Sequence, residues 1–215
     1  MSYGRAIKLF PEDSLSIHDI YFKYWRSSDS EKVYRLDRLT SKTMIDIYNK
    51  VKNNLKPLLL TLSRSNSINL SQANEFSELY SYYDYFRGEG LFSYYLSSDK
   101  DFEPVLRVIK MISIEATKDK SFFYSLFQLR DKVSTYAGVT EAIPDFLIDA
   151  IKNNPMGFLD LFADQDSFNR IQYSKYIYNI DGQDEQLVKI LKDISTKNTK
   201  PYQALSKKLL LQLDK

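Results

Sequence analysis

Few residues of this chain could support the commoner kinds of catalysis or metal binding. His18 is the only histidine, and the 215 residues include no cysteine. A zinc site of the usual kind needs several histidine or cysteine ligands, and a Ser-His-Asp or Cys-His centre needs an imidazole. Because His18 follows Ser16-Ile17 near an expected helix start, we interpret it as an exposed or capping residue. We therefore expect neither a metal nor another cofactor.

Carboxylates alone can hydrolyse glycosidic bonds when two of them face each other about 5–10 Å apart. The best-placed acid is Glu89, which lies in the turn Gly88-Glu89-Gly90 among several tyrosines. A sugar site lined with tyrosine would have this composition, but a Gly-Glu-Gly sequence is also typical of a simple turn. The second carboxylate is not evident from the sequence. A carboxylate-dependent glycan hydrolase centred on Glu89 is therefore the alternative hypothesis.

Other sequence motifs for ligand binding fail on their spacing. No complete glycine-rich phosphate-binding loop occurs. Asp160, Asp164 and Asp166 suggest a calcium loop. A loop that started at Asp164 would need glycine at its sixth position and glutamate at its twelfth, where Asn169 and Lys175 stand. We interpret the three aspartates instead as part of an acidic surface for a partner.

Charge is distributed unevenly along the chain, although the net charge is only +2. Residues 141–185 contain nine acids and three bases, a net charge of −6. Residues 186–215 contain seven bases and two acids, a net charge of +5. Either these neighbouring segments attract each other, or the acidic one forms a surface that meets a basic partner.

A smaller basic stripe with helical spacing precedes these segments and consists of Lys32, Arg35, Arg38 and Lys42. It could contact phosphates only if it joined further bases in space, such as Lys207 and Lys208. Glu31 and Asp37 dilute its charge. We therefore expect a solvated face here and no nucleic-acid partner.

Tyrosine is the unusual component of the chain, with 17 residues, six of them between Tyr80 and Tyr95. On an expected helix from Ser71, one face holds Phe76, Leu79, Tyr80, Tyr83 and Phe86. Tyr82 and Tyr85 fall on another face near Glu78, and Tyr94 points away from the apolar side of the next segment. Tyrosine is enriched in binding hot spots.

Three interpretations of these tyrosines remain open: a partner surface, a second face covered by a neighbouring helix, or a small-molecule pocket. Under the first, the residues predicted to bind a partner are Glu78, Tyr82, Tyr85, Arg87, Glu89, Tyr94, Asp160, Asp164 and Asp166.

Apolar residues at three- and four-residue spacing predict about ten short helices. One begins after Ser41 and ends at Asn53-Asn54, with a separate short helix after Pro57. Others cover 101–112, with Pro104 in the first turn, and 121–136, with Gly138 as the C-terminal cap. Pro144 and Pro155 are expected at first helical positions. Residues 167–179, 183–195 and 201–214 are also expected to be helical.

Two stretches resemble each other. Residues 51–62 and 151–162 both read aliphatic-Lys-Asn-Asn, three residues, then large apolar-Leu. We interpret each as a helix end followed by a turn and a short helix that packs back, which is how α-solenoids are built. A common helix ending in a Lys/Asn-rich chain is the other explanation.

We therefore predict one all-α domain over residues 1–215, with a weak sub-boundary near 98–100 as an option. Its helices should form antiparallel pairs in an irregular bundle or a short HEAT-like α-solenoid. We expect a non-catalytic module that binds another protein, in its most specific form a bacterial immunity or inhibitor protein that blocks a basic enzyme or toxin. The Lys/Asn/Ile/Ser-rich usage is typical of low-GC bacteria.

The N-terminus contains no apolar stretch of signal-peptide length before Pro11. We expect a soluble cytoplasmic protein by default, or a periplasmic one if a leader has been removed. No apolar run approaches the roughly 18 residues of a membrane span.

Overall fold

The structure is a computed structural model, and it describes residues 42–88, 92, 96, 99–134, 137–164, 174–179, 182–197 and 199–213. Within this part of the chain, eight α-helices, two 3-10 helices (η2, η3) and one two-stranded ribbon are present. The elements are α4 (Lys42–Arg64), α5 (Leu70–Gly88), α6 (Asp99–Ala116), η2 (Lys120–Phe122), α7 (Phe123–Lys132), α8 (Ala137–Asn153), α9 (Pro155–Asp164), η3 (Ser174–Ile177), β1 (Tyr178–Asn179), β2 (Gly182–Gln183), α11 (Glu185–Lys197) and α12 (Lys200–Leu213). The all-α prediction is confirmed.

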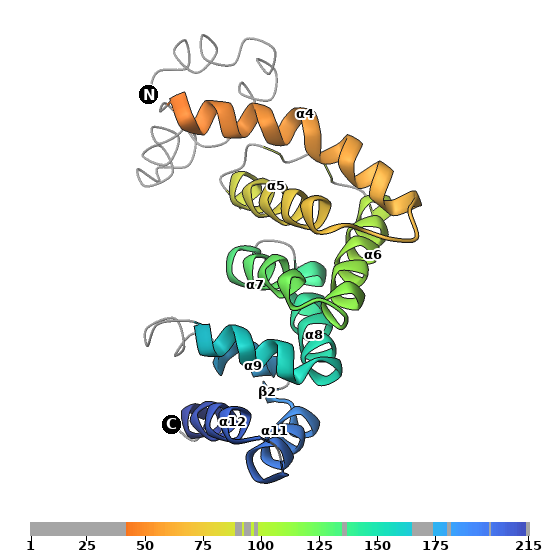
Figure 1. The fold of residues 1–215 in the computed structure, drawn as a ribbon. Helices are drawn as coiled ribbons and strands as arrows, with labels where there is room; N and C mark the ends of the chain where they lie inside the picture. Colours follow the sequence, from red (N-terminus) through yellow and green to blue (C-terminus); the bar gives the residue numbers. More distant parts are fainter. Residues whose placement is uncertain are drawn as a thin grey trace, which may run out of the picture.

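The helices are arranged in two columns (Figure 1). In one column α5 packs against α7 and α9 against α12, and in the other α6 packs against α8 and α8 against α11. Helix α4 covers α5 and α6 at one end of the stack, and the hairpin of α11 and α12 forms the other end. The molecule is therefore an elongated array in which each helix contacts its neighbours along the stack.

Helices α5 and α7 run in the same direction. Near their starts, the Ser125 hydroxyl donates to the Asn74 side-chain oxygen at 2.7 Å. Near their ends, the Ser134 amide donates to Oδ2 of the buried Asp84, also at 2.7 Å. The second contact lies about ten residues after the first in both segments. Because the two contacts follow in the same order along both helices, α5 and α7 must be parallel.

Helices α6 and α8 are parallel too. The Ser113 hydroxyl, late in α6, donates to the Phe146 carbonyl at 2.7 Å. Near the starts, the ring of Phe102 lies only 2.7 Å from where a Cβ of Gly138 would be, so glycine permits this close approach. In each of these two pairs, helices that follow each other within one column thus run in the same direction. This arrangement corresponds to the α-solenoid alternative of the prediction. The prediction that Gly138 caps the preceding helix was wrong, because α7 already ends at Lys132.

Helix α5 is enclosed on two sides. The residues predicted to face the core are all buried, namely Phe76, Leu79, Tyr80, Tyr83 and Phe86. A second side, which carries Ala73, Ser77 and Ser81, is buried as well because α7 packs there. Beyond the end of α5, Phe92 is buried and stacks on Tyr48 of α4 with ring centroids 4.8 Å apart. The second covered side is therefore not the one that carries Tyr82 and Tyr85, whereas Tyr80 and Tyr83 belong to the core.

Two predicted helix boundaries were wrong. Helix α4 continues through Asn53-Asn54 and contains Pro57, so no separate short helix follows the asparagines. Proline lacks the amide that would bond to the carbonyl four residues earlier, which explains the bend of α4 in Figure 1. Pro144 lies inside α8, which starts at Ala137, and not at a first helical position. Pro155 is the first residue of α9, as predicted.

The predicted helix over 167–179 was also wrong in its described part. Residues 174–177 form one 3-10 turn, and Tyr178–Asn179 then pair with Gly182–Gln183 as an antiparallel ribbon. Gly182 has φ +117°, a conformation that glycine adopts without strain. Tyr176 is held by tertiary contacts, because its ring stacks on Phe127 at 4.4 Å. Residues 165–173, like the helices expected at 30–39 and most of 91–96, lie outside the described residues.

Candidate protein-binding surfaces

The outward side of α5 carries three of the predicted binding residues. Glu78, Tyr82 and Tyr85 share this side, as their helical spacing predicts. Tyr85 is 38% exposed, whereas Tyr82 is half-buried and packs against the core. Glu78 accepts a hydrogen bond from Lys50 Nζ at 3.0 Å, in an exposed ion pair between α5 and α4. Of the predicted residues on this side, one exposed ring and one paired carboxylate are therefore offered to a partner.

The remaining predicted residues around α5 are not brought together by the described structure. Arg87 is half-buried at the end of α5 and, by helix rotation, lies opposite Tyr82. Glu89, Tyr94 and Asp166 lie outside the described residues, so their predicted roles stay predictions. The same holds for a hydrolase centred on Glu89.

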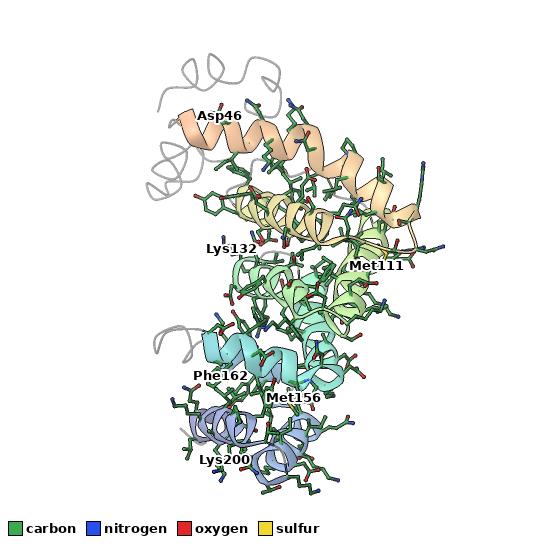
Figure 2. All side chains as sticks on the ribbon, viewed as in Figure 1. Asp46, Met111, Lys132, Met156, Phe162 and Lys200 are labelled. Atoms are coloured by element: carbon green, nitrogen blue, oxygen red, sulfur yellow. The ribbon has the colours of Figure 1, made fainter. Side chains whose placement is uncertain are left out.

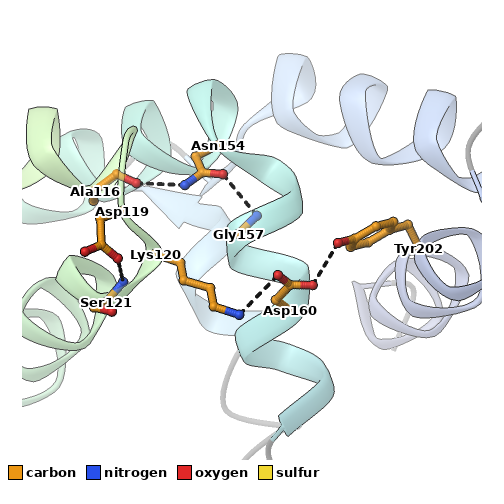
Figure 3. Close-up of polar contacts among 8 residues, drawn as sticks. All are labelled: Ala116, Asp119, Lys120, Ser121, Asn154, Gly157, Asp160 and Tyr202. Carbon is orange, nitrogen blue, oxygen red and sulfur yellow. Dashed lines mark hydrogen bonds and ion pairs between the residues drawn. The ribbon is translucent and has the colours of Figure 1, made fainter.

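Asp160 of α9 connects three elements of the stack. Figure 3 shows its carboxylate between Lys120 of η2 and Tyr202 of α12, at 3.1 Å from the Lys120 ammonium and 2.9 Å from the Tyr202 hydroxyl. The hydrogen bond to Asp160 raises the pKa of Lys120 and also raises the pKa of Tyr202, because both groups keep their protons while they donate to the carboxylate. Asp160 therefore already has partners within the chain.

Asn154 determines where α9 begins and hence where Asp160 lies. Its side-chain oxygen accepts the Gly157 amide at 3.0 Å, which caps the helix, and its amide nitrogen donates to the Ala116 carbonyl at 2.9 Å, which satisfies the end of α6 (Figure 3). A Cβ at Gly157 would lie 2.6 Å from the Asn154 side chain. Glycine at this position thus leaves room for a side chain that joins two helix ends.

Asp164 is exposed one turn after Asp160, at the end of α9. Its charge contributes to the raised pKa of Lys120, though less than the hydrogen bond from Asp160 does. No group of three metal-ligating side chains occurs among the described residues. Asp164 is thus exposed and has no direct ion-pair partner among the described residues, whereas Asp160 is paired.

A stripe of carboxylates on α8 was missed by the sequence analysis. Glu141, Asp145 and Asp149 follow at four-residue spacing, and all three are exposed. Within the described chain, Glu141 and Asp145 have no ion-pair partner. Asp149 is 4.0 Å from Lys152, which is itself 2.8 Å from Asp184. The signal was present as charge spacing, but it was hidden because Pro144 was assigned to a helix start, which left Glu141 outside the helix.

This α8 stripe is electrostatically costly for the helix that carries it. Like charges four residues apart destabilise a helix by about 0.2–0.5 kcal/mol per pair. Glu141 benefits from the positive end of the helix dipole, but Asp149 lies in the last turns, where negative charge is unfavourable. At its outward side the neighbouring α6 carries Arg107 and Lys110 beside a single exposed acid among its described side chains, Glu103. The stripe is therefore specific to α8 and not a general feature of the column.

Among the described residues, no ion pair joins the acidic segment 141–185 to the basic segment 186–215. Among the described acids of 141–185, Asp160 pairs with Lys120, and Asp149 and Asp184 pair with Lys152. In the C-terminal hairpin, Lys197 pairs with Asp193 of the same helix. The α8 stripe and most lysines of the hairpin thus remain available at the surface.

Comparisons with protein-family models, with curated proteins and with solved structures found no match for this chain. Among the described helices, none is both long enough and apolar enough to cross a membrane.

Proposed function

We propose that this protein is a non-catalytic helical scaffold that binds another protein, and that the α8 stripe meets a basic surface on that partner. The observation that carries the proposal is the row of Glu141, Asp145 and Asp149, exposed and only partly compensated. Repulsion between these carboxylates lowers the stability of α8. A basic partner that neutralises them in a complex would explain why they are present. The solenoid supports this because stacked helix pairs present extended surfaces of this kind.

The most specific form of the proposal is an inhibitor or immunity protein. An enzyme or toxin that acts on nucleic acid or another polyanion has a basic substrate cleft. A rigid row of carboxylates can occupy such a cleft as a mimic of the substrate charge. Tyr85, with an exposed ring, is the residue of the α5 side best suited to add contact area to a complex. The residues predicted around it remain part of this proposal.

The test is affinity capture of a partner by the wild type and by a Glu141→Lys/Asp145→Lys variant. We expect a stoichiometric partner whose affinity falls at least about tenfold in the variant at low salt, because two attractive charges become repulsive. The wild-type affinity should fall as salt rises, and the variant should lose most of that dependence. If the partner is an enzyme, its activity should be inhibited by the wild type and much less by the variant.

The matched control is Asp46→Lys/Glu103→Lys, which makes the same change in net charge on exposed positions of α4 and α6. It should bind the partner as the wild type does. A partner that binds the α8 variant and the wild type equally well would contradict the assignment of the surface. A glycan hydrolysed by the wild type but not by Glu89→Gln would instead support the enzyme hypothesis.

A further inference from the structure

The end of the stack formed by α11 and α12 is strongly basic. Six lysines are exposed on this hairpin, namely Lys189, Lys192, Lys197, Lys200, Lys207 and Lys208. Only Glu185 and Asp193 are exposed acids there, and Asp193 is paired with Lys197 at 3.2 Å. Figure 2 places Lys200 at the opposite end of the molecule from Asp46 of α4. The hairpin is the last packed layer, so its outer side faces away from the rest of the described chain.

The outward side of α12 combines lysines with apolar residues. At about 100° per residue, Ala204 and Leu211 lie at its centre, Lys200 and Lys207 on one flank and Lys208 on the other. Leu211 is 65% exposed, the most exposed of the large hydrophobic residues in the described chain. The opposite side of α12 is occupied, because Leu209 is fully buried and Tyr202 bonds to Asp160.

We infer that this hairpin docks on a membrane surface that contains anionic lipids. Lysines around an apolar centre are the pattern of a helix that lies in the bilayer interface, where the ammonium groups meet lipid phosphates and the apolar side chain reaches the acyl boundary. A nucleic-acid site would gain nothing from an exposed leucine at its centre. It would also need further bases beside those of this hairpin.

The expected binding is weak and dependent on salt. Each basic residue near an anionic bilayer strengthens binding about fivefold. Only the lysines on the outer side contribute, and the exposed Glu185 offsets part of their effect. Docking at this end leaves the α8 stripe, in the middle of the stack, free for a protein partner. The inference is independent of the proposed function.

The experiment is flotation of the full chain with phosphatidylcholine vesicles that contain about 30% phosphatidylserine, compared with phosphatidylcholine alone. We expect binding to the anionic vesicles only, with loss at about 0.5 M salt. Lys207→Glu/Lys208→Glu should weaken binding at least about 25-fold, from the same fivefold per charge. Leu211→Ser should weaken it about threefold to tenfold, because the apolar contact is lost.

The control is Lys110→Glu/Lys132→Glu, which changes the net charge equally at exposed positions of α6 and α7. It should bind anionic vesicles nearly as the wild type does. Circular dichroism and thermal unfolding verify that each variant is folded. Equal loss in this control would show a non-specific effect of net charge. Absence of vesicle binding by the wild type, or binding of duplex DNA or RNA that Leu211→Ser leaves unchanged, would overturn the inference.

Discussion

Asp184 shows how one side chain can connect two layers of the stack. Its carboxylate accepts the Leu187 amide at 2.8 Å, which caps α11, and pairs with Lys152 of α8 at 2.8 Å. Burial by itself would raise the pKa of Asp184. The hydrogen bonds from Lys152 and from the Leu187 amide outweigh burial, so the pKa lies below its usual range. The charged form is therefore the one that the fold stabilises.

This lowered pKa predicts a loss of stability in acid. Because the folded pKa is below the unfolded one, the contribution is complete above about pH 4 and disappears as the pH falls through the folded value. Asp184→Asn keeps an acceptor for the cap but removes the charge, so it should cost about 1 kcal/mol at pH 7. Urea unfolding at pH 7 and pH 3 measures this difference, which should shrink at pH 3.

Glu185→Gln is the control for Asp184→Asn, because Glu185 is the neighbouring acid and is exposed. Its effect should be small at both pH values. A cost of Asp184→Asn that stays the same from pH 7 to pH 3 would show that the pair with Lys152 does not stabilise the fold.

Single residues were predicted well where helix rotation alone decides the outcome. The inward residues of α5 were identified because large apolar and aromatic side chains recur along it at three- and four-residue spacing. The partial burial of Tyr82 could not be predicted, because it depends on contacts with the packed core. Asp160 was predicted as a surface group, but Lys120 and Tyr202, 40 and 42 residues away, approach it only in the folded chain.

At the scale of elements, the same Lys-Asn-Asn sequence has two outcomes. In α4, Asn54 is exposed and the helix continues. After α8, Asn154 lies between two helices. The difference lies in the next residue: Pro155 disfavours helical geometry at Asn154, whereas Pro57 comes three residues after Asn54 and only bends the helix. The resemblance of residues 51–62 and 151–162 is thus not accompanied by the same local structure.

This difference predicts opposite effects of one substitution at the two sites. Asn154→Ala removes the cap of α9 and leaves the Ala116 carbonyl without its donor, which should cost about 2 kcal/mol. Asn54→Ala replaces an exposed asparagine by a better helix former and should stabilise α4 by up to about 0.7 kcal/mol. Thermal unfolding of both variants measures the contrast. Equal effects would contradict the assignment of Asn154 as a joint between α6 and α9.

For the whole molecule, the amphipathic pattern predicted an all-α chain but could not choose between a bundle and a solenoid. Periodicity identifies which side of a helix is buried, not which helix covers it. The decision is made by contacts between segments far apart in sequence, such as Ser113 with Phe146 and Asn74 with Ser125. Such pairs leave no periodic trace in the sequence, because each involves only one or two polar side chains on otherwise ordinary helices.

A solenoid distributes stability differently from a bundle with one shared core, because each layer depends mainly on its neighbours. Leu209 of α12 and Leu126 of α7 are both fully buried, the first in the end layer and the second in the middle of the stack. Either leucine replaced by alanine should cost about 2–5 kcal/mol locally. Leu209→Ala should open α11 and α12 while α5 to α8 stay protected, whereas Leu126→Ala should reduce protection on both sides of α7.

Hydrogen exchange followed by mass spectrometry of peptides distinguishes these outcomes helix by helix. The comparison is controlled internally, since both variants lose the same atoms from equally buried positions. If Leu209→Ala accelerated exchange in α5 as much as in α12, the chain would unfold as one cooperative unit and the layers would not be energetically separable. Local opening confined to the hairpin would instead mean that the basic end can loosen while the α8 stripe keeps its geometry, so that the two proposed surfaces can act separately.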